Sequence, residues 1–124
     1  ALINTYDNTI VYTDHVLAST IDLLKQQPVA SSMLYLSDHG ESTGESGLYL
    51  HGTPYMVAPK EQTHIPMLLW FSQNWSERHH IYQCLSHYKD SAWSQDNLFP
   101  TMLSLLDVKS KVIDPNNDML AACP

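Results

Sequence analysis

The chain has 124 residues, the length of one ordinary domain or of a segment of a larger one. Hydrophobic residues make up 44% and charged residues only 15%, so the composition favours a packed core over disorder. Thirteen acidic and six basic residues give a net charge of −7, which argues against binding nucleic acid through its phosphates. No apolar run approaches the roughly 18–20 residues of a membrane span. Because the chain begins with Ala1 and not with methionine, we expect it to be a segment of a longer protein.

A helix is predicted from Tyr6 to about Gln26. Its apolar residues recur at helical spacing and would form one buried face: Ile10, Leu17, Ile21 and Leu24. Asn4 or Thr5 can cap its start, because both side chains accept hydrogen bonds from free backbone amides. Pro28 ends it, since the residue before a proline resists helical dihedral angles.

Two short apolar runs predict buried strands, Ser32–Leu36 and Ile65–Phe71. The first gives way abruptly to polar residues at 37–41. A helix, a buried strand and polar groups at the end of that strand are the layout of an α/β ligand site. Residues 40–63 hold all four glycines of the chain and predict a long loop, which in a compact domain is usually functional.

The last third of the chain predicts one further helix. It ends near Leu106, and its cap lies at Asp96 or Asn97 rather than at Ser94, because Pro100 is tolerated only in a first turn. The expected buried face consists of its large apolar residues: Phe99, Met102, Leu103, Leu105 and Leu106. The stretch 72–93 predicts no clear element, and the polar tail after the helix is expected to lie on the surface.

The two cysteines, Cys84 and Cys123, lie in no spacing typical of a metal site. If they pair, they close a loop of about 40 residues, worth roughly 4 kcal/mol in the chain-entropy model. Pairing would also imply an oxidising compartment. The alternatives are two free thiols, or partners elsewhere, and sequence alone does not decide between them.

The adjacent Asp38 and His39 follow the first predicted strand. A carboxylate and an imidazole together offer ligands that zinc accepts. Neighbours on a strand point to opposite faces, but Gly40 indicates that the chain is already turning, so both side chains can face one ion. The alternative is a turn aspartate that caps backbone amides beside a solvent-exposed histidine.

His51 lies twelve residues beyond His39, in the glycine-rich loop. It can donate to a phosphate or alkoxide oxygen or bind a second metal, or it can be an ordinary surface histidine. Glu41 is close enough to Asp38 to affect a bound cation. No motif of a serine hydrolase or of a nucleotide-binding loop occurs. The remaining histidines predict no site: His15, His64, His79, His80 and His87.

A series of longer motifs runs through most of the chain. They are YLSDHGES at 35–42, GE at 44–45, YLHGTPY at 49–55, AP at 58–59, IPMLLW at 65–70, YDN at 6–8 and SQDNLF at 94–99. Together they closely resemble the C-terminal part of the lipid A phosphoethanolamine transferases, which include the mobile colistin-resistance enzymes. The resemblance thins at 72–93 and after residue 107.

The resemblance implies an α/β domain of the alkaline-phosphatase-like, sulfatase type, with a central sheet flanked by helices. Residues 1–124 would be the C-terminal fragment of a periplasmic catalytic domain, with the nucleophile half and the inner-membrane domain outside them. It implies zinc as the cofactor, with Asp38 and His39 as two of its ligands. His51 would contact substrate phosphate or an additional zinc, and Glu41 matches a motif acid whose role stays open.

The implied reaction moves phosphoethanolamine from phosphatidylethanolamine to a phosphate of lipid A through a phosphothreonine intermediate. The threonine is expected outside this chain, so the fragment alone should be inactive, and membrane association should come from the absent N-terminal segment. Two alternatives are kept. One is another alkaline-phosphatase-like phosphotransferase, phosphodiesterase or sulfatase, and the other is a non-catalytic binding module on this fold.

Overall fold

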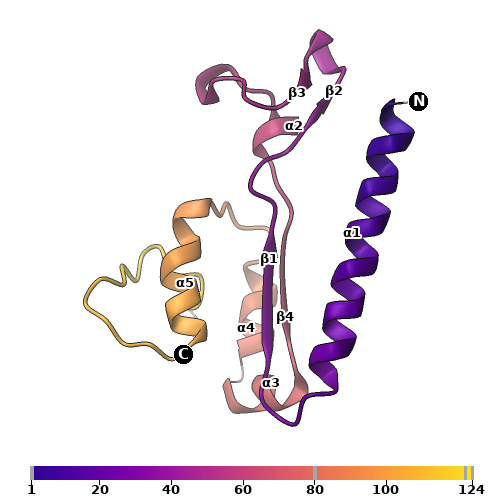
Figure 1. The fold of residues 1–124 in the computed structure, drawn as a ribbon. Coiled ribbons are helices and arrows are strands. Elements are labelled where there is room, and N and C mark those ends of the chain that lie inside the picture. The colour runs from indigo at the N-terminus through magenta and orange to yellow at the C-terminus, as the bar shows by residue number, and fades with distance from the viewer. Residues whose placement is uncertain (1, 80, 122, 124) are drawn as a thin grey trace. The chain divides into compact units, whose positions relative to one another are not determined.

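The structure, a computed structural model, describes residues 2–79, 81–121 and 123. The chain divides into two compact units, residues 1–71 and residues 72–124, and each is described by itself. Helices and strands are mixed in the first unit, and helices and turns make up the second (Figure 1). Within the described residues, no helix is both long and apolar enough to cross a bilayer.

The first unit begins with helix α1, Leu2–Lys25. It starts four residues earlier than predicted, so Asn4 and Thr5 lie inside the helix and do not cap it. It ends three residues before Pro28, as the proline requires. One face is partly covered, at Tyr6, Thr13, Leu17, Ile21 and Leu24. Ile10, predicted on that face, is exposed, and no residue of α1 is fully buried.

Strands β1, Ser32–Leu36, and β4, Met67–Phe71, pair antiparallel with Leu36 opposite Met67. Both strands were expected, and β4 begins just after Pro66, which has no amide hydrogen to give to a ladder. The prediction that they are buried on both faces is wrong for this chain. All of β1 is half-buried and the first two residues of β4 are exposed, because the described sheet of these strands has only two members.

The predicted loop at 40–63 is folded into short elements. These are β2 Ser42–Thr43, a 3-10 turn at Glu45–Gly47, β3 Tyr49–Leu50, a 3-10 turn at Tyr55–Val57 and helix α2 Lys60–Thr63. β2 and β3 pair antiparallel as a small hairpin. Its turn needs glycine because the φ angles of Gly44 and Gly47 are +133° and +76°.

The second unit contains α3 Gln73–His79, α4 Ile81–His87, a 3-10 turn at Gln95–Asn97 and α5 Leu98–Leu105. The stretch 72–93, for which no element was predicted, thus holds two short helices. Asn97 is the N-cap residue of α5, in agreement with the prediction. Asn97 makes no side-chain cap bond, however, and the prediction against Ser94 is wrong, because Ser94 caps the preceding 3-10 turn. Its hydroxyl accepts from the amide of Asp96, and its own amide donates to the side chain of Asn97.

The core of the second unit differs from the predicted one. Phe99, Met102 and Leu106 are exposed, while Pro100 and Thr101 are the buried residues of α5. Leu103 and Leu105, also expected in the buried face, are half-buried. The polar tail was expected on the surface, and Val108 and Val112 are exposed there, but three residues near its end are buried.

Met119, Leu120 and Cys123 of that tail are buried. The amide of Met119 donates to the hydroxyl of the fully buried Thr101 over 3.0 Å. Cys123 is bonded to Cys84 of α4, which answers the question that the sequence left open. The tail is therefore part of the packed unit and is fixed to it covalently.

Candidate metal centre

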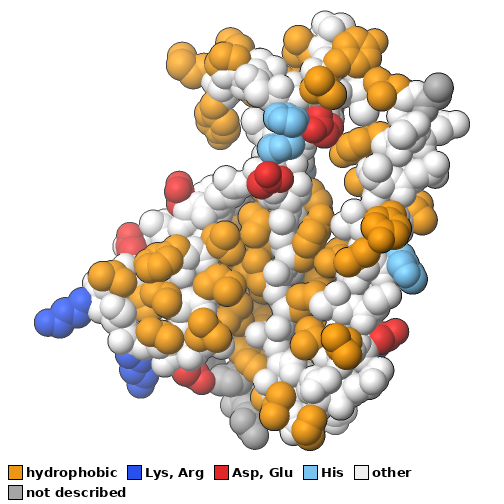
Figure 2. All heavy atoms as spheres, in the orientation of Figure 1, with side chains coloured by type: hydrophobic (Ala, Val, Ile, Leu, Met, Phe, Trp, Pro, Cys, Tyr) orange, Lys and Arg blue, Asp and Glu red, His pale blue; other side chains and the backbone are white. Residues whose placement is uncertain are grey.

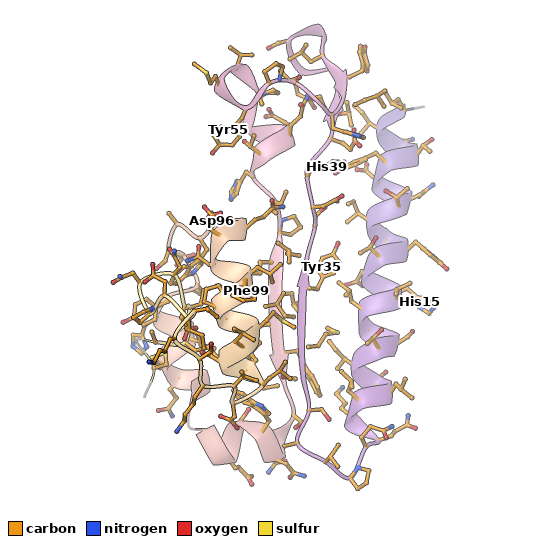
Figure 3. All side chains as sticks on the ribbon, turned by 60° about the vertical axis from the view of Figure 1, so that its left-hand side comes forward. His15, Tyr35, His39, Tyr55, Asp96 and Phe99 are labelled. Atoms are coloured by element: carbon orange, nitrogen blue, oxygen red, sulfur yellow. A yellow bond between two sulfur atoms is a disulfide. The ribbon has the colours of Figure 1, made fainter. Side chains whose placement is uncertain are left out.

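The predicted site residues gather just beyond the end of β1. Asp38, His39 and Glu41 follow this strand, and His51 follows β3. Figure 3 shows His39 past the end of the strand that carries Tyr35, and Figure 2 shows histidine and acidic side chains gathered at one place on the surface. The pairing of β1 with β4 continues weakly for one residue beyond both strands, because the amide of Ser37 donates to the carbonyl of Pro66 over 3.4 Å. The site residues follow directly after this bond.

The hairpin register explains how His51 arrives beside Glu41. Ser42 pairs with Leu50, so the same register continued by one residue places Glu41 opposite His51. The Nδ1–H of His51 donates to Oε1 of Glu41 over 2.6 Å, because a carboxylate only accepts. Leu50 and Gly52, on either side of His51, have φ angles of +65° and +94°. At Leu50 this costs on the order of 1 kcal/mol, and such strain is often found at functional sites.

The ring of His39 is held by a hydrogen bond to the backbone of the next residue. Its Nδ1–H donates to the carbonyl of Gly40 over 3.0 Å, which leaves Nε2 free to bind an ion. The hydroxyl of Ser37 donates to the carbonyl of His39 over 2.7 Å. The His39 ring lies against that of His51, with centroids 3.9 Å apart. The two predicted histidines are therefore in direct contact.

Asp38 and His39 meet the distance test for ligands of one zinc ion. Oδ2 of Asp38 lies 3.7 Å from Nε2 of His39. Two ligands about 2.0–2.1 Å from a tetrahedral ion stand about 3.3 Å apart, so a movement of a few tenths of an ångström brings both to one ion. The expectation that these adjacent side chains face the same space agrees with this distance. Whether they bind zinc stays a prediction.

Ligand atoms of His39, Glu41 and His51 also lie within 4.8 Å of one another, a second arrangement that can hold a cation. Oε1 of Glu41 is 4.0 Å from Nδ1 of His39. The side chain of Asp38 is 87% exposed and that of Glu41 only 29% exposed, so the two carboxylates differ in access to water. The cluster thus offers one open acidic ligand, one sheltered carboxylate and two imidazoles.

Glu45, the other loop acid in the matched motifs, is not in this cluster. Hydrogen bonds from its own backbone amide and from the hydroxyl and amide of Thr43 lower the pKa of its carboxyl. His15 and His64 are exposed, and His87 bonds the carbonyl of Gln83 in its own helix. The side chain of His79 and all of His80 lie outside the described part of the chain.

Sequence reasoning missed Gln62, a buried residue of α2 that bonds both the segment next to Glu41 and the segment next to His51. Its Nε2 donates to Oγ of the buried Ser42 over 2.8 Å, and its Oε1 accepts from the amide of Thr53 over 3.2 Å. Its carbonyl accepts from the amide of Gly40 over 3.0 Å. No local pattern predicts these bonds, because they depend on how α2 packs against segments 9 and 20 residues away.

Comparison with known proteins identifies the family. The model of the sulfatase family matches residues 1–108, and the chain belongs to that family. The chain is 48% identical over 126 aligned residues to phosphoethanolamine transferase EptA of Escherichia coli O157:H7, covering 98% of this chain and 23% of the relative. It is 43% identical to phosphatidylethanolamine transferase Mcr-2 of Escherichia coli, with 87% of this chain and 19% of that protein covered.

Solved structures give the same result. The soluble domain of lipooligosaccharide phosphoethanolamine transferase A from Neisseria meningitidis matches with a TM-score of 0.91 at 43% identity, covering 98% of this chain and 38% of that one. The C-terminal periplasmic domain of EptC from Campylobacter jejuni matches with a TM-score of 0.87 at 50% identity, covering 97% and 38%. The predicted sulfatase-type α/β fold and the resemblance to phosphoethanolamine transferases are confirmed. The chain spans 23% of the length of the EptA relative from Escherichia coli O157:H7 and 19% of the length of Mcr-2.

Proposed function

We propose that the protein containing this chain is a zinc-dependent transferase that moves phosphoethanolamine from phosphatidylethanolamine to a phosphate of lipid A. The observation that carries the proposal is the convergence of Asp38, His39, Glu41 and His51 at one end of β1. The names of its relatives support phosphoethanolamine as the transferred group. A relative in Salmonella typhimurium that is 40% identical over 91 residues is a Kdo(2)-lipid A phosphoethanolamine 7''-transferase.

Asp38 and His39 would hold the zinc ion, one through a carboxylate oxygen and the other through Nε2. The donor set suits the metal, and the bond from His39 Nδ1 to the Gly40 carbonyl fixes the ring so that Nε2 faces Asp38. When bound, zinc supplies positive charge that stabilises phosphoryl oxygens and makes an attacking alcohol more acidic. A glutamate and the threonine nucleophile, both outside this chain, would complete the ligand set.

His51 would bind a phosphoryl oxygen through Nε2. Its Nδ1–H is occupied by Glu41, so the orientation of the ring is set before a substrate arrives. Glu41 would therefore act as the residue that orients His51, a role that the sequence left open. The alternative for this pair is a share in an additional cation with His39, for which the three residues are close enough.

The covalent step would use the threonine, which takes up phosphoethanolamine from the donor and then passes it to lipid A. This chain would supply part of the metal site and the phosphate contact, and alone it would be inactive. A periplasmic position is supported by the EptC domain, and a membrane anchor by the full-length Neisseria meningitidis protein, which is an integral membrane protein.

The test uses the full-length protein, with labelled phosphatidylethanolamine as donor and lipid A as acceptor. We expect His51→Ala to lower transfer at least about 100-fold while zinc content stays at the wild-type level. Asp38→Asn should lose zinc and transfer together. His15→Ala, at an exposed histidine of α1, is the matched control and should behave like wild type. Absence of transfer by the wild-type protein would contradict the proposal, and loss of zinc in His51→Ala would contradict the role given to His51.

The sulfatase family also includes enzymes that hydrolyse sulfate esters, which is the remaining catalytic alternative. Both reactions use a metal site that stabilises charge on tetrahedral oxyanions. The same protein should therefore be incubated with a chromogenic aryl sulfate. We expect no sulfate release, and hydrolysis of this substrate without phosphoethanolamine transfer would favour the sulfatase function instead.

A further inference from the structure

We propose that Gln62 is a positioning residue of this site: its side chain holds the segment carrying Glu41 and the segment carrying His51 in the register that lets the two bond. The inference deepens the proposed function and rests on it for its activity readout. The printed hydrogen bonds of Gln62 go to Gly40, Ser42 and Thr53, which are neighbours of Glu41 and His51, so it would act through those two residues.

The geometry of the three bonds leads to this role. The carbonyl of Gln62 accepts from Gly40 and its Nε2 donates to Ser42, the two residues that flank Glu41. Its Oε1 accepts from the amide of Thr53, two residues after His51. One buried side chain thus bonds both to β2, next to Glu41, and to the segment that follows β3 and His51. The β2–β3 ladder itself has only two residue pairs, too few to fix a register firmly.

Only one orientation of the amide group satisfies its partners. The amide of Thr53 can only donate, so it must face Oε1, and Nε2 is then directed at Ser42. Gln62 and Ser42 are 6% and 3% exposed, so water does not readily replace these bonds. Among the described residues, no buried polar side-chain atom lacks a partner. A change at Gln62 would therefore leave two polar groups without a bond, and the segments would shift to reach new partners.

The backbone nearby is packed as closely as this role requires. A Cβ atom on Gly40 would overlap the carbonyl oxygen of Glu61 and lie 3.2 Å from Cα of Gln62. The chain before Glu41 therefore lies directly against α2, with no side chain between them. Through this contact the short helix would control the position of Glu41, which is the next residue along the chain.

Gln62→Met in the full-length protein is the primary test, because methionine keeps the length and volume of the side chain but makes neither bond. In a crystal structure of this variant, we expect the distance between His51 Nδ1 and Glu41 Oε1 to exceed hydrogen-bond range. Transfer should fall 10- to 100-fold. The double variant Gln62→Met/His51→Ala should be no slower than His51→Ala, because both changes remove the same contact.

Controls separate positioning from a general loss of stability. Gln73→Met removes an exposed glutamine whose side chain donates to Glu77, and it should leave the distance and the rate unchanged. If Gln62→Met does not fold, Ser42→Ala replaces it, since this change removes one of the two bonds and should produce a smaller shift in the same direction. An unchanged distance, or a double variant slower by the product of the two single effects, would overturn the proposal. A wild-type protein without transfer would refute the proposed function but leave the crystallographic test of Gln62 valid.

Discussion

Replacing Gly40 with alanine should disrupt the site through a single added carbon atom. Gly40 does not have a positive φ angle, so the cost is not conformational. The new Cβ would instead overlap the carbonyl oxygen of Glu61, and it would lie only 3.0 Å from the carbonyl carbon of the same residue. These are backbone atoms and cannot rotate away, so either α2 or the segment after β1 must move.

The size of the effect follows from that movement. Overpacking of a closed contact typically costs about 1–3 kcal/mol, and we expect about 3 kcal/mol because the hydrogen bond from Gly40 to Gln62 is lost as well. A displacement of about 1 Å at a phosphate contact can lower a rate about 100-fold. We therefore expect Gly40→Ala to reduce both the free energy of unfolding and phosphoethanolamine transfer, as measured by urea denaturation and by the labelled-donor assay.

Gly47→Ala is the matched control. The φ angle of Gly47 is +76°, but no atom lies within 4 Å of a Cβ placed there, so the cost is confined to the backbone, at about 1 kcal/mol. This variant should keep transfer within a few-fold of wild type. If Gly40→Ala retained wild-type transfer, or lost no more activity than Gly47→Ala, the close contact would not support the site and the reasoning would be wrong.

Two smaller predictions concern single side chains. Thr101→Val should lower the free energy of unfolding by about 1–3 kcal/mol in chemical denaturation, because the amide of Met119 loses its buried acceptor. A loss below about 0.5 kcal/mol, which is the size of an ordinary surface substitution, would contradict this prediction. Hydrogen bonds from its own backbone and from Thr43 lower the pKa of Glu45, so NMR should show its carboxyl titrating below 4.5. The stabilisation from this acid is present above pH 4.5 and is lost as pH falls through the folded-state pKa; a midpoint at or above 4.5 would contradict these hydrogen bonds.

The part of the fold that could be predicted rests on short-range signals. The apolar run at 32–36 is too short for a helix and is bounded by polar residues, and the structure has a strand there with the predicted end. The polar residues after it and the glycine at position 40 indicated a turn that carries chemistry. Asp38 and His39 do lie close together at that turn. Local pattern was sufficient here because a strand end and the side chains next to it are adjacent in sequence.

The rest depends on contacts between distant segments. Helix α5 is apolar at most positions, so the predicted buried face took in most of its large apolar residues. In the structure Phe99 is exposed, and Thr101, whose hydroxyl accepts from the amide of Met119, is buried instead. The role of Gln62 could not be predicted either, because a glutamine five residues before a strand has no recognisable partners until the hairpin is formed. Both errors have the same physical cause: which side chain is buried was decided by partners about 20 residues away.

The disulfide between Cys84 and Cys123 is expected to be a main support of the second unit. The two residues are 39 positions apart, and closing a loop of this length restricts the unfolded chain by about 4 kcal/mol in the chain-entropy model. The double variant Cys84→Ala/Cys123→Ala should therefore lose about this much free energy of unfolding in urea. Reducing the wild-type protein should produce the same loss, while the same reductant should leave the variant unchanged. A double variant within 1 kcal/mol of wild type would mean that the buried Met119 and Leu120 hold the tail in place without the covalent link.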